Sequence, residues 1–265
     1  MKTLEYSNDT IKNLFDITGK TAIITGGGGE LGLAMAKGLA NNGANIVLTG
    51  RTQATLDKAA EALADTGAKV LTVAGDSISI EDCENIVAKT VAEFGSVDIL
   101  IHTAGVARRF EAEVFPKDAF DLVIDTNVKG AFYMDQAVGK QMIAQGKGGK
   151  IINISSVRAN NGHPLGYSAY ATSKGAVNSL TKQLASEWAK YDINVNAIGP
   201  TIVLSPLTQQ IFDNEESAKI FTDRILFGRP MVSGELIGAA IYLASPASDF
   251  VTGHILYVDG GCVSG

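Results

Sequence analysis

Short runs of apolar, mostly β-branched residues alternate with longer amphipathic stretches along most of the chain. The runs predict strands at Thr21–Thr25, Asn45–Thr49, Lys69–Val73, Val97–Ile101, Lys150–Ile154, Ile193–Ile198 and His254–Val258. The stretches between them predict helices at Leu31–Asn41, Thr52–Asp65, Ile80–Phe94, Lys117–Ile143, Tyr170–Tyr191 and Ser233–Ala244. This alternation is typical of right-handed βαβ units, which build a parallel sheet covered by helices on both faces. It predicts an α/β fold with a doubly wound, seven-stranded parallel sheet, the Rossmann fold.

Two segments depart from the alternation. Residues 1–18 precede the first predicted strand, and we expect them to form an N-terminal extension. Residues 200–230 follow the sixth strand and contain no predicted strand, which is typical of a substrate lid. No tract rich in proline, glycine or serine marks a second domain. We therefore expect residues 19–265 to form a single Rossmann-type catalytic domain with a helical lid at about 200–230.

Composition narrows the possible partners. The formal net charge of -6 argues against nucleic acid, whose phosphates require a basic surface. No apolar run approaches the ~20 residues that span a bilayer, and residues 1–18 are polar and mixed in charge, unlike a secretion signal. Cys83 and Cys262 are too few for a disulfide framework or a metal knuckle. We expect a cytoplasmic protein with a small-molecule ligand, no metal and no membrane partner.

A glycine-rich turn joins the first predicted strand to the first long helix. Gly27, Gly29 and Gly32 satisfy the pattern G-x-G-x-x-G in the required strand-to-helix context. Glycines allow the backbone to approach a pyrophosphate, whose charge meets the free N–H groups of the helix start. The residues expected to contact a dinucleotide here are Gly26, Gly28, Gly29, Leu31 and Gly32. The alternative is a tight turn without a ligand.

The end of the second predicted strand bears on cofactor choice. NAD enzymes usually carry an acidic residue there for the ribose hydroxyls, whereas this chain has Gly50, followed by Arg51 and Thr52. An arginine can bind a 2′-phosphate, so we expect NADP(H); if Arg51 is merely solvated, NAD remains possible. Beyond the third strand, Asp76 with Ser77 is expected to contact the adenosine, or Asp76 instead caps the next helix.

The most specific pattern is Tyr170-Ala-Thr-Ser-Lys174. Positions i and i+4 share one face of a helix. A phenol, with a pKa near ~10, is a poor base at neutral pH, and a nearby ammonium is expected to lower that pKa. Such a pair suits proton transfer to or from an alcohol while a hydride passes to or from a nicotinamide.

With these motifs in place, the chain resembles the short-chain dehydrogenase/reductase family over nearly its whole length. The segments that carry the resemblance are Thr25–Gly32, Ala104–Gly105, Asn127, Ser156, Tyr170, Lys174, Asn196–Pro200 and Val258–Gly261. The resemblance implies that Ser156 binds the substrate oxygen, with Ser155 the weaker candidate. It also implies that Asn127 holds a water in a proton relay to Lys174, which grips the nicotinamide ribose. Further cofactor contacts are implied for Ala104, Gly105, Val203 and Ser205.

Several positions differ from the family pattern. Glu30 stands where the family has glycine, and we expect its carboxylate to turn into solvent at the helix start, where the dipole favours it. His102 and Thr103 replace an asparagine pair, and His102 is expected to be structural. Thr201 replaces the glycine after Pro200, and Ser205 replaces a carboxamide-binding threonine. These differences concern cofactor affinity rather than the reaction class.

Arg108 and Arg109 follow the fourth predicted strand. This pair resembles that of the gluconate 5-dehydrogenases and 2-keto-3-deoxygluconate dehydrogenases within the family, and an arginine fork suits a carboxylate. The alternative is a solvated pair. His163, in the loop between Ser156 and Tyr170, is a candidate donor to sugar hydroxyls or is itself merely solvated.

The sequence thus predicts an NADP(H)-dependent oxidoreductase of a sugar acid or polyol. One alternative is a 3-oxoacyl thioester or steroid ketoreductase, and another is a non-catalytic dinucleotide-binding regulator. The resemblance further implies a homotetramer.

Overall fold

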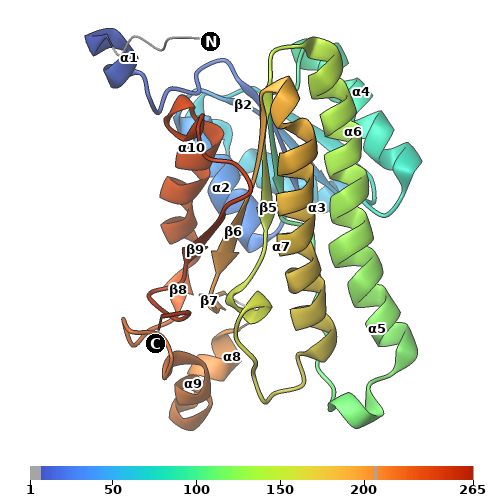
Figure 1. The fold of residues 1–265 in the computed structure, drawn as a ribbon, viewed down its shortest axis with the longest axis vertical. Helices are drawn as coiled ribbons and strands as arrows, with labels where there is room; N and C mark the ends of the chain where they lie inside the picture. Colours follow the sequence, from blue (N-terminus) through green and yellow to red (C-terminus); the bar gives the residue numbers. More distant parts are fainter. Residues whose placement is uncertain (1–6, 206–207, 265) are drawn as a thin grey trace.

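The core of the fold is a seven-stranded parallel sheet, seen nearly edge-on in Figure 1. The computed structural model describes residues 7–205 and 208–264. The strands are β1 (Thr21–Thr25), β2 (Asn45–Gly50), β3 (Val70–Ala74), β4 (Ile99–His102), β5 (Gly149–Ile154), β6 (Ile193–Pro200) and β9 (Ile255–Val258). They lie in the order β3-β2-β1-β4-β5-β6-β9, and every neighbouring pair is parallel. The predicted Rossmann-like sheet is confirmed.

Helices cover both faces of this sheet. One face carries α2 (Glu30–Asn41), α3 (Gln53–Glu61) and α10 (Ile237–Ala244); the other carries α4 (Ile80–Phe94), α6 (Gly130–Gln145) and α7 (Ser168–Trp188). Successive strand residues point to opposite faces, so Ile24 packs in the core with α2 and α10, while Ile23 packs in the core with α4 and α6. Burial on both faces explains why the strands are continuous apolar runs.

The predicted helix Lys117–Ile143 is interrupted. It comprises α5 (Lys117–Ile124), a π-helical turn at Asp125–Lys129 and α6. Such wide turns often occur at functional sites, and this one contains the buried Asn127, whose side chain bonds to main-chain atoms of Val106. An apolar pattern does not reveal the turn, because its cause is a contact with another segment.

Three other predicted helices change type at one end. Short 3-10 turns occupy Ala64–Thr66 after α3, Ala189–Tyr191 after α7 and Ser233–Leu236 before α10. Further 3-10 turns lie at Ala112–Val114, Val157–Ala159 and Pro246–Ser248.

Residues 200–230 do contain a strand, contrary to the prediction. The two residues of β7 (Val203–Leu204) pair in parallel with β8 (Met231–Val232), too short a run for periodicity to detect. The helices α8 (Gln209–Phe212) and α9 (Glu215–Thr222) lie between them. Residues 206–207 of the predicted lid lie outside the described part of the chain.

The N-terminal segment begins with α1 (Asn8–Lys12), at the opposite end of the molecule from α8 and α9 (Figure 1). The end of this segment belongs to the core, because Ile17 is only 1% exposed. Residues 1–6 of the predicted extension lie outside the described residues. No helix in the part that is described is long and apolar enough to cross a membrane.

Candidate active site

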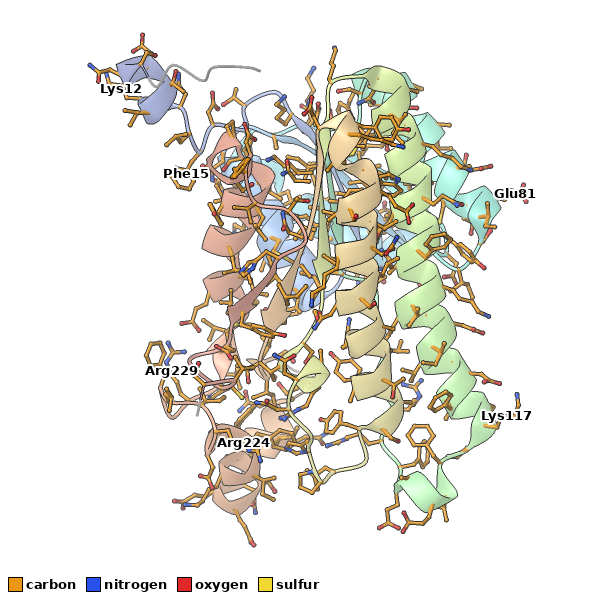
Figure 2. All side chains as sticks on the ribbon, in the orientation of Figure 1. Lys12, Phe15, Glu81, Lys117, Arg224 and Arg229 are labelled. Carbon is orange, nitrogen blue, oxygen red and sulfur yellow. The ribbon has the colours of Figure 1, made fainter. Side chains whose placement is uncertain are left out.

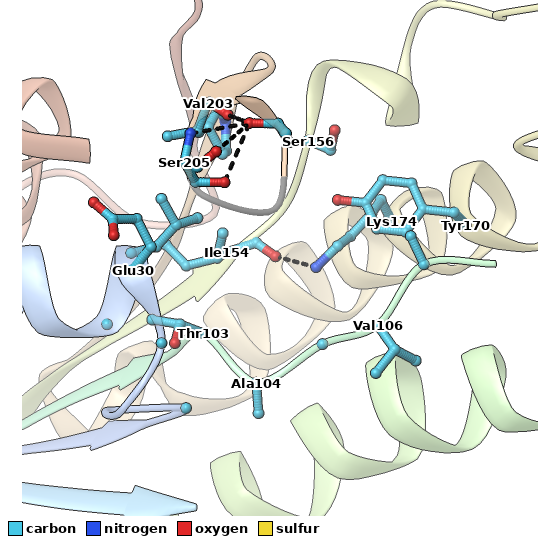
Figure 3. Close-up of a pocket in the computed structure, with 18 of the residues that line it drawn as sticks. Glu30, Thr103, Ala104, Val106, Ile154, Ser156, Tyr170, Lys174, Val203 and Ser205 are labelled. Atoms are coloured by element: carbon cyan, nitrogen blue, oxygen red, sulfur yellow. Dashed lines mark hydrogen bonds between the residues drawn. The ribbon is translucent and has the colours of Figure 1, made fainter. Parts of the chain in front are cut away.

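A cavity of about 670 Å³ opens beyond the carboxyl ends of the parallel strands. Its walls come from the segments that follow β1, β2, β4, β5 and β6, together with the start of α7 and part of α9 (Figure 3). The sheet order reverses direction between β1 and β4, and ligands of open α/β sheets bind beside such a point. The topology therefore brings residues distant in sequence around one space.

The glycine-rich turn forms the floor at one end of this cavity. Gly26 has φ +62°, and a Cβ there would lie 2.7 Å from Thr103 Oγ1. A Cβ on Gly32 would lie 2.4 Å from the Gly26 carbonyl oxygen. Gly29 caps α2 without a side-chain hydrogen bond, so the helix start presents N–H groups to the cavity, a good setting for a phosphate.

Most of the residues predicted to contact the cofactor line the cavity. Lining residues among the predicted cofactor contacts are Gly26, Gly28, Gly29, Leu31, Gly32, Arg51, Thr52, Ala104, Gly105, Tyr170, Lys174, Val203 and Ser205. Gly27 of the G-x-G-x-x-G pattern does not line it, because this residue packs against Leu48, 2.9 Å from where its Cβ would be. Thr55, which packs against Gly28, lines the cavity and was not predicted.

Asp76 and Ser77 do not line the cavity. The Asp76 carboxylate accepts the N–H of Ile78 at 3.3 Å, and Ser77 is buried beside Gly130. Ser79, not Asp76, caps α4 through a 3.2 Å hydrogen bond from the Asp82 N–H. The structure thus corrects the proposed capping role of Asp76.

Glu30 has a hydrogen-bond partner that its neighbours in sequence do not reveal. Ser233, 203 residues away, donates its hydroxyl to the Glu30 carboxylate at 2.6 Å. Glu30 is exposed, and Figure 3 shows its carboxylate directed away from Tyr170 and Lys174. The negative charge is thereby held by a hydroxyl on the segment preceding α10.

Tyr170 and Lys174 lie in the first turns of α7, within the cavity wall. The Lys174 ammonium donates to the carbonyl of Ile154 at 2.7 Å and lies 5.7 Å from the centre of the Tyr170 ring. Burial lowers the pKa of Lys174 to about 8. In the protein alone, burial also raises the pKa of Tyr170, while hydrogen bonding with Ser156 and the charge of Arg158 oppose the rise.

The predicted lowering of the Tyr170 pKa by Lys174 is therefore wrong for the protein alone. The desolvation of a buried phenol disfavours its charged form, and the ammonium is held against the Ile154 carbonyl beside the ring. The ammonium donates one hydrogen bond among the described residues, to Ile154, so its other N–H groups remain for further partners.

The two serines at the end of β5 have different surroundings. Ser155 donates its hydroxyl to Asn178 Oδ1 at 2.5 Å, so this proton is already used in a hydrogen bond within the protein. Ser156 lines the cavity beside Tyr170 and accepts the backbone N–H of Arg158 at 3.1 Å. Its hydroxyl also interacts with the Tyr170 phenol, which is consistent with Ser156 as the better candidate.

Asn127 is buried behind the cavity wall rather than in it. Its amide bonds the N–H and carbonyl of Val106 at 2.7 and 2.9 Å, and it donates to Ser173 at 2.9 Å. A Cβ on Gly105 would lie 3.2 Å from Asn127 Oδ1 and 3.6 Å from the Lys174 nitrogen. Gly105 thus lies between the Asn127 and Lys174 side chains, and it has no side chain of its own.

The positions that differ from the family pattern, His102, Ser205 and Thr201, have the following surroundings. Burial lowers the pKa of His102 to about 3, and its Nδ1 lies 3.1 Å from Thr25 Oγ1, so it is neutral and structural as predicted. Ser205 bonds to Thr208, which also lines the cavity. Thr201 belongs to the cavity wall, and its buried hydroxyl has no hydrogen-bond partner among the residues described.

Three of the predicted substrate residues, Arg108, Arg109 and His163, are not part of the cavity wall. Arg108 and Arg109 are exposed; Arg108 bonds to the adjacent carbonyl of Ala107 at 3.0 Å. His163 stacks on Phe221 with centroids 5.0 Å apart, and burial together with the charge of Arg158 lowers its pKa to about 4. It is a packed, neutral ring rather than a solvated one.

Three lining residues near Tyr170 were missed from sequence. They are Arg158, Tyr167 and Phe221. Arg158 stands two residues after Ser156, and Tyr167 stands one helical turn before Tyr170, so spacing from the candidate catalytic residues could have found both. Phe221 comes from α9 and has no such relation in sequence.

The cavity fits a dinucleotide by its own features. The uncapped start of α2 and the close-packed glycines suit a pyrophosphate. The ammonium of Lys174 lies beside the candidate catalytic tyrosine in the same cavity wall. This arrangement, on a Rossmann-like sheet, defines a nicotinamide-dependent oxidoreductase.

Comparison with known proteins agrees with that class. A family model described as enoyl-(acyl carrier protein) reductase matches residues 29–263. The chain is 42% identical over 251 residues to a 2-dehydro-3-deoxy-D-gluconate 5-dehydrogenase of Dickeya dadantii, covering 95% of this chain and 98% of the relative. It is 37% identical over 252 residues to an NAD-dependent glycerol dehydrogenase of Listeria innocua, covering 93% and 95%.

A solved structure extends the likeness to three dimensions. The gluconate 5-dehydrogenase of Burkholderia cenocepacia, in complex with NADP and tartrate, matches with a TM-score of 0.90 at 36% identity, covering 96% of this chain and 98% of that one. The chain therefore belongs to the short-chain dehydrogenase/reductase family. It is an NAD(P)-dependent dehydrogenase akin to the sugar-acid dehydrogenases.

Proposed function

We propose that this enzyme interconverts the alcohol and ketone of a sugar acid, or of a related polyol, with NADP(H). The observation that carries the proposal is the set of Ser156, Tyr170 and Lys174 in one cavity wall, with the cationic Arg158 beside it. The names of the relatives support the substrate class, since they include sugar-acid dehydrogenases and a glycerol dehydrogenase.

In this mechanism Ser156 and Tyr170 hold the reacting oxygen by two hydrogen bonds. When bound, the nicotinamide would accept or donate the hydride. During oxidation Tyr170 takes the hydroxyl proton, and during reduction it returns one. Lys174 carries a positive charge next to the ring and, with a pKa of about 8, can pass a proton onward at neutral pH. Asn127 holds the adjoining loop through its two hydrogen bonds to Val106. In this proposal it also holds the water of a proton relay to Lys174.

The preference for NADP(H) rests on the end of β2. Arg51 and Thr52 line the cavity, and Gly50 offers no carboxylate to the ribose. A Cβ at Gly50 would contact only Leu56, at 3.6 Å, so the absence of an acidic residue is not imposed by packing. Arg51 binds the 2′-phosphate in this proposal.

Residues 19–265 act as one catalytic domain, with residues 200–230 as the lid. Val203, Ser205 and Thr208 border the cavity before α9, and Phe221 borders it from α9. The lid therefore reaches both the nicotinamide end and the substrate end. The enzyme works in the cytoplasm as a homotetramer in this proposal.

The test is a substrate panel with purified enzyme. NADPH oxidation would be followed with keto-sugar acids, and NADP reduction with aldonic acids and polyols, beside 3-oxoacyl thioesters and a ketosteroid. We expect turnover with members of the sugar-acid group. Turnover confined to thioesters or steroids would reject the proposal in favour of a lipid ketoreductase.

A further inference from the structure

Arg158 occupies an unusual place in the cavity wall. It lies on the 3-10 turn Val157–Ala159, and its backbone N–H donates to Ser156 Oγ at 3.1 Å. The turn is anchored to the end of β5, whose neighbours β4 and β6 are buried. The backbone that carries Arg158 is therefore positioned by the same hydrogen bond that orients Ser156.

The Arg158 side chain is only partly exposed, yet no carboxylate balances its charge. Within the described residues, no acidic side chain forms a salt bridge or hydrogen bond with it. Burial lowers the Arg158 pKa, and the like charge of the nearby Arg224 lowers it further. A desolvated guanidinium without an acid is unfavourable unless a ligand supplies the negative charge.

Arg158 also forms the inner member of a cationic group around Tyr167. The guanidinium carbons of Arg158 and Arg109 lie 5.7 and 5.8 Å from the centre of the Tyr167 ring. Arg158 and Tyr167 line the cavity, whereas Arg109 is exposed outside it. Arg224 lies at the same end of the molecule as α9 (Figure 2). Of these charges, solvent screens Arg158 least.

We propose that Arg158 is the residue that binds the carboxylate of the substrate, in place of the exposed Arg108–Arg109 pair. This inference rests on the proposed function and names the residue that selects acids over neutral polyols at the same site. The planar guanidinium binds a carboxylate through two parallel hydrogen bonds. With Ser156 two residues away, the carboxylate and the reacting oxygen are bound by adjacent parts of one turn. Arg109 and Arg224 attract the anion without contacting it.

The test compares an acid with a matched neutral substrate. Arg158→Gln would be assayed with the best sugar acid of the panel and with the corresponding polyol, which lacks the carboxylate. We expect kcat/KM for the acid to fall about 10- to 100-fold relative to kcat/KM for the polyol, as for loss of a charge-assisted hydrogen bond. Any change that acts through the Tyr170 pKa affects both substrates and cancels in this ratio. Arg158→Lys should recover part of the loss, because it keeps the charge but not the fork. Arg224→Gln, a loss of exposed charge from the same group, is the matched control and should change KM by less than about threefold.

Tartrate binding gives a readout that is independent of turnover. Calorimetry with tartrate and the NADP complex should show binding by the wild type and loss in Arg158→Gln, with NADP affinity unchanged. A KM increase confined to Arg109→Gln would overturn the inference, as would an equal loss with acid and polyol. If the wild type turned over no sugar acid but bound tartrate through Arg158, the proposed function would fail while the anion site remained. Unaltered tartrate binding in Arg158→Gln would reject the anion site.

Discussion

Lys174 and Tyr170 show how burial governs proton affinity in the cavity. Desolvation lowers the pKa of the ammonium and raises that of the phenol, so it favours the uncharged form of both. A substrate oxygen and a positively charged nicotinamide change these surroundings only when they are bound. The catalytic competence of Tyr170 therefore depends on the assembled complex, not on the helix that carries the pair.

Tyr170→Phe should abolish proton transfer while it preserves packing. Because only the phenolic oxygen is removed, we expect kcat to fall about 10²- to 10⁴-fold, with little change in the stability of the fold. Steady-state kinetics would be measured beside circular dichroism and NADPH affinity, which serve as controls for the fold and the cofactor site. Wild-type turnover in a folded, NADPH-binding variant would contradict the mechanism.

Arg51→Asp should shift the cofactor preference. The carboxylate repels a 2′-phosphate and accepts from ribose hydroxyls, so kcat/KM for NADPH should fall about 10- to 100-fold while NADH is used as well or better. Lys58→Gln, which removes an exposed positive charge from the neighbouring α3, is the matched control. An Arg51→Asp enzyme that still prefers NADPH would show that this arginine does not read the phosphate.

Among the elements, the turn between β1 and α2 leaves little space for an added side chain. The turn brings Gly26, Gly32 and Thr103 so close that a methyl group has no space at either glycine. The close approach follows from the register of β1 against β4, which places Thr25 opposite His102. The same constraint keeps the start of α2 open toward the cavity.

Gly32→Ala should damage both stability and dinucleotide binding. Its Cβ would lie 2.4 Å from the Gly26 carbonyl oxygen, so the turn must shift. We expect a lower Tm and an NADPH Kd raised at least about tenfold, since the loop no longer presents its N–H groups. Gly238→Ala is the control, because this exposed helical glycine has open space around its Cβ and alanine there should stabilise by about 0.5–1 kcal/mol. Equal behaviour of the two variants would contradict the packing argument.

A buried carboxyl joins α6 to the sheet. Asp135 is fully buried, and it accepts from Asn153 Nδ2 at 3.0 Å. Asp135 Oδ1 and Asn153 Oδ1 have no partners among the residues described. Burial raises the Asp135 pKa from 3.8 to about 7.

Because the folded pKa is raised, the neutral carboxyl stabilises the protein at low pH. That contribution is complete below the unfolded pKa near 3.8 and is lost as the pH rises through about 7. Asp135→Asn stays neutral, so its stability relative to the wild type should increase from pH 5 to pH 8. Urea unfolding of both proteins across this range checks the difference, in which other titrating groups cancel. Parallel curves would mean that Asp135 does not titrate between these values.

At the scale of the molecule, the surface carries large apolar side chains that the chain itself leaves uncovered. The Phe250 side chain is fully exposed, and Phe120, Leu122 and Phe132 on α5 and α6 are partly exposed. Apolar side chains of this size on a surface often belong to an interface between subunits. This agrees with the proposed homotetramer.

The mass in solution tests that assembly. Light scattering of the purified protein should give about four protomers, the commonest larger closed assembly after dimers. Phe250→Ser is expected to shift the mass toward smaller species without unfolding the protomer, because the side chain contributes nothing to its core. A monomeric wild type would reject the tetramer.

The periodicity of the chain was sufficient to predict the sheet and its main helices, because alternation and helical spacing report burial along a single element. The four-residue spacing of Tyr170 and Lys174 likewise holds within one helix. Contacts between distant segments lay beyond such patterns: the hydrogen bond from Ser233 to Glu30, the wide turn at Asn127, and the inward Arg158 against the exposed Arg108–Arg109 pair. The direction of the Tyr170 pKa belongs to the same group. Desolvation and charge act through space, so they are decided only when the strands and the loops beyond them have come together.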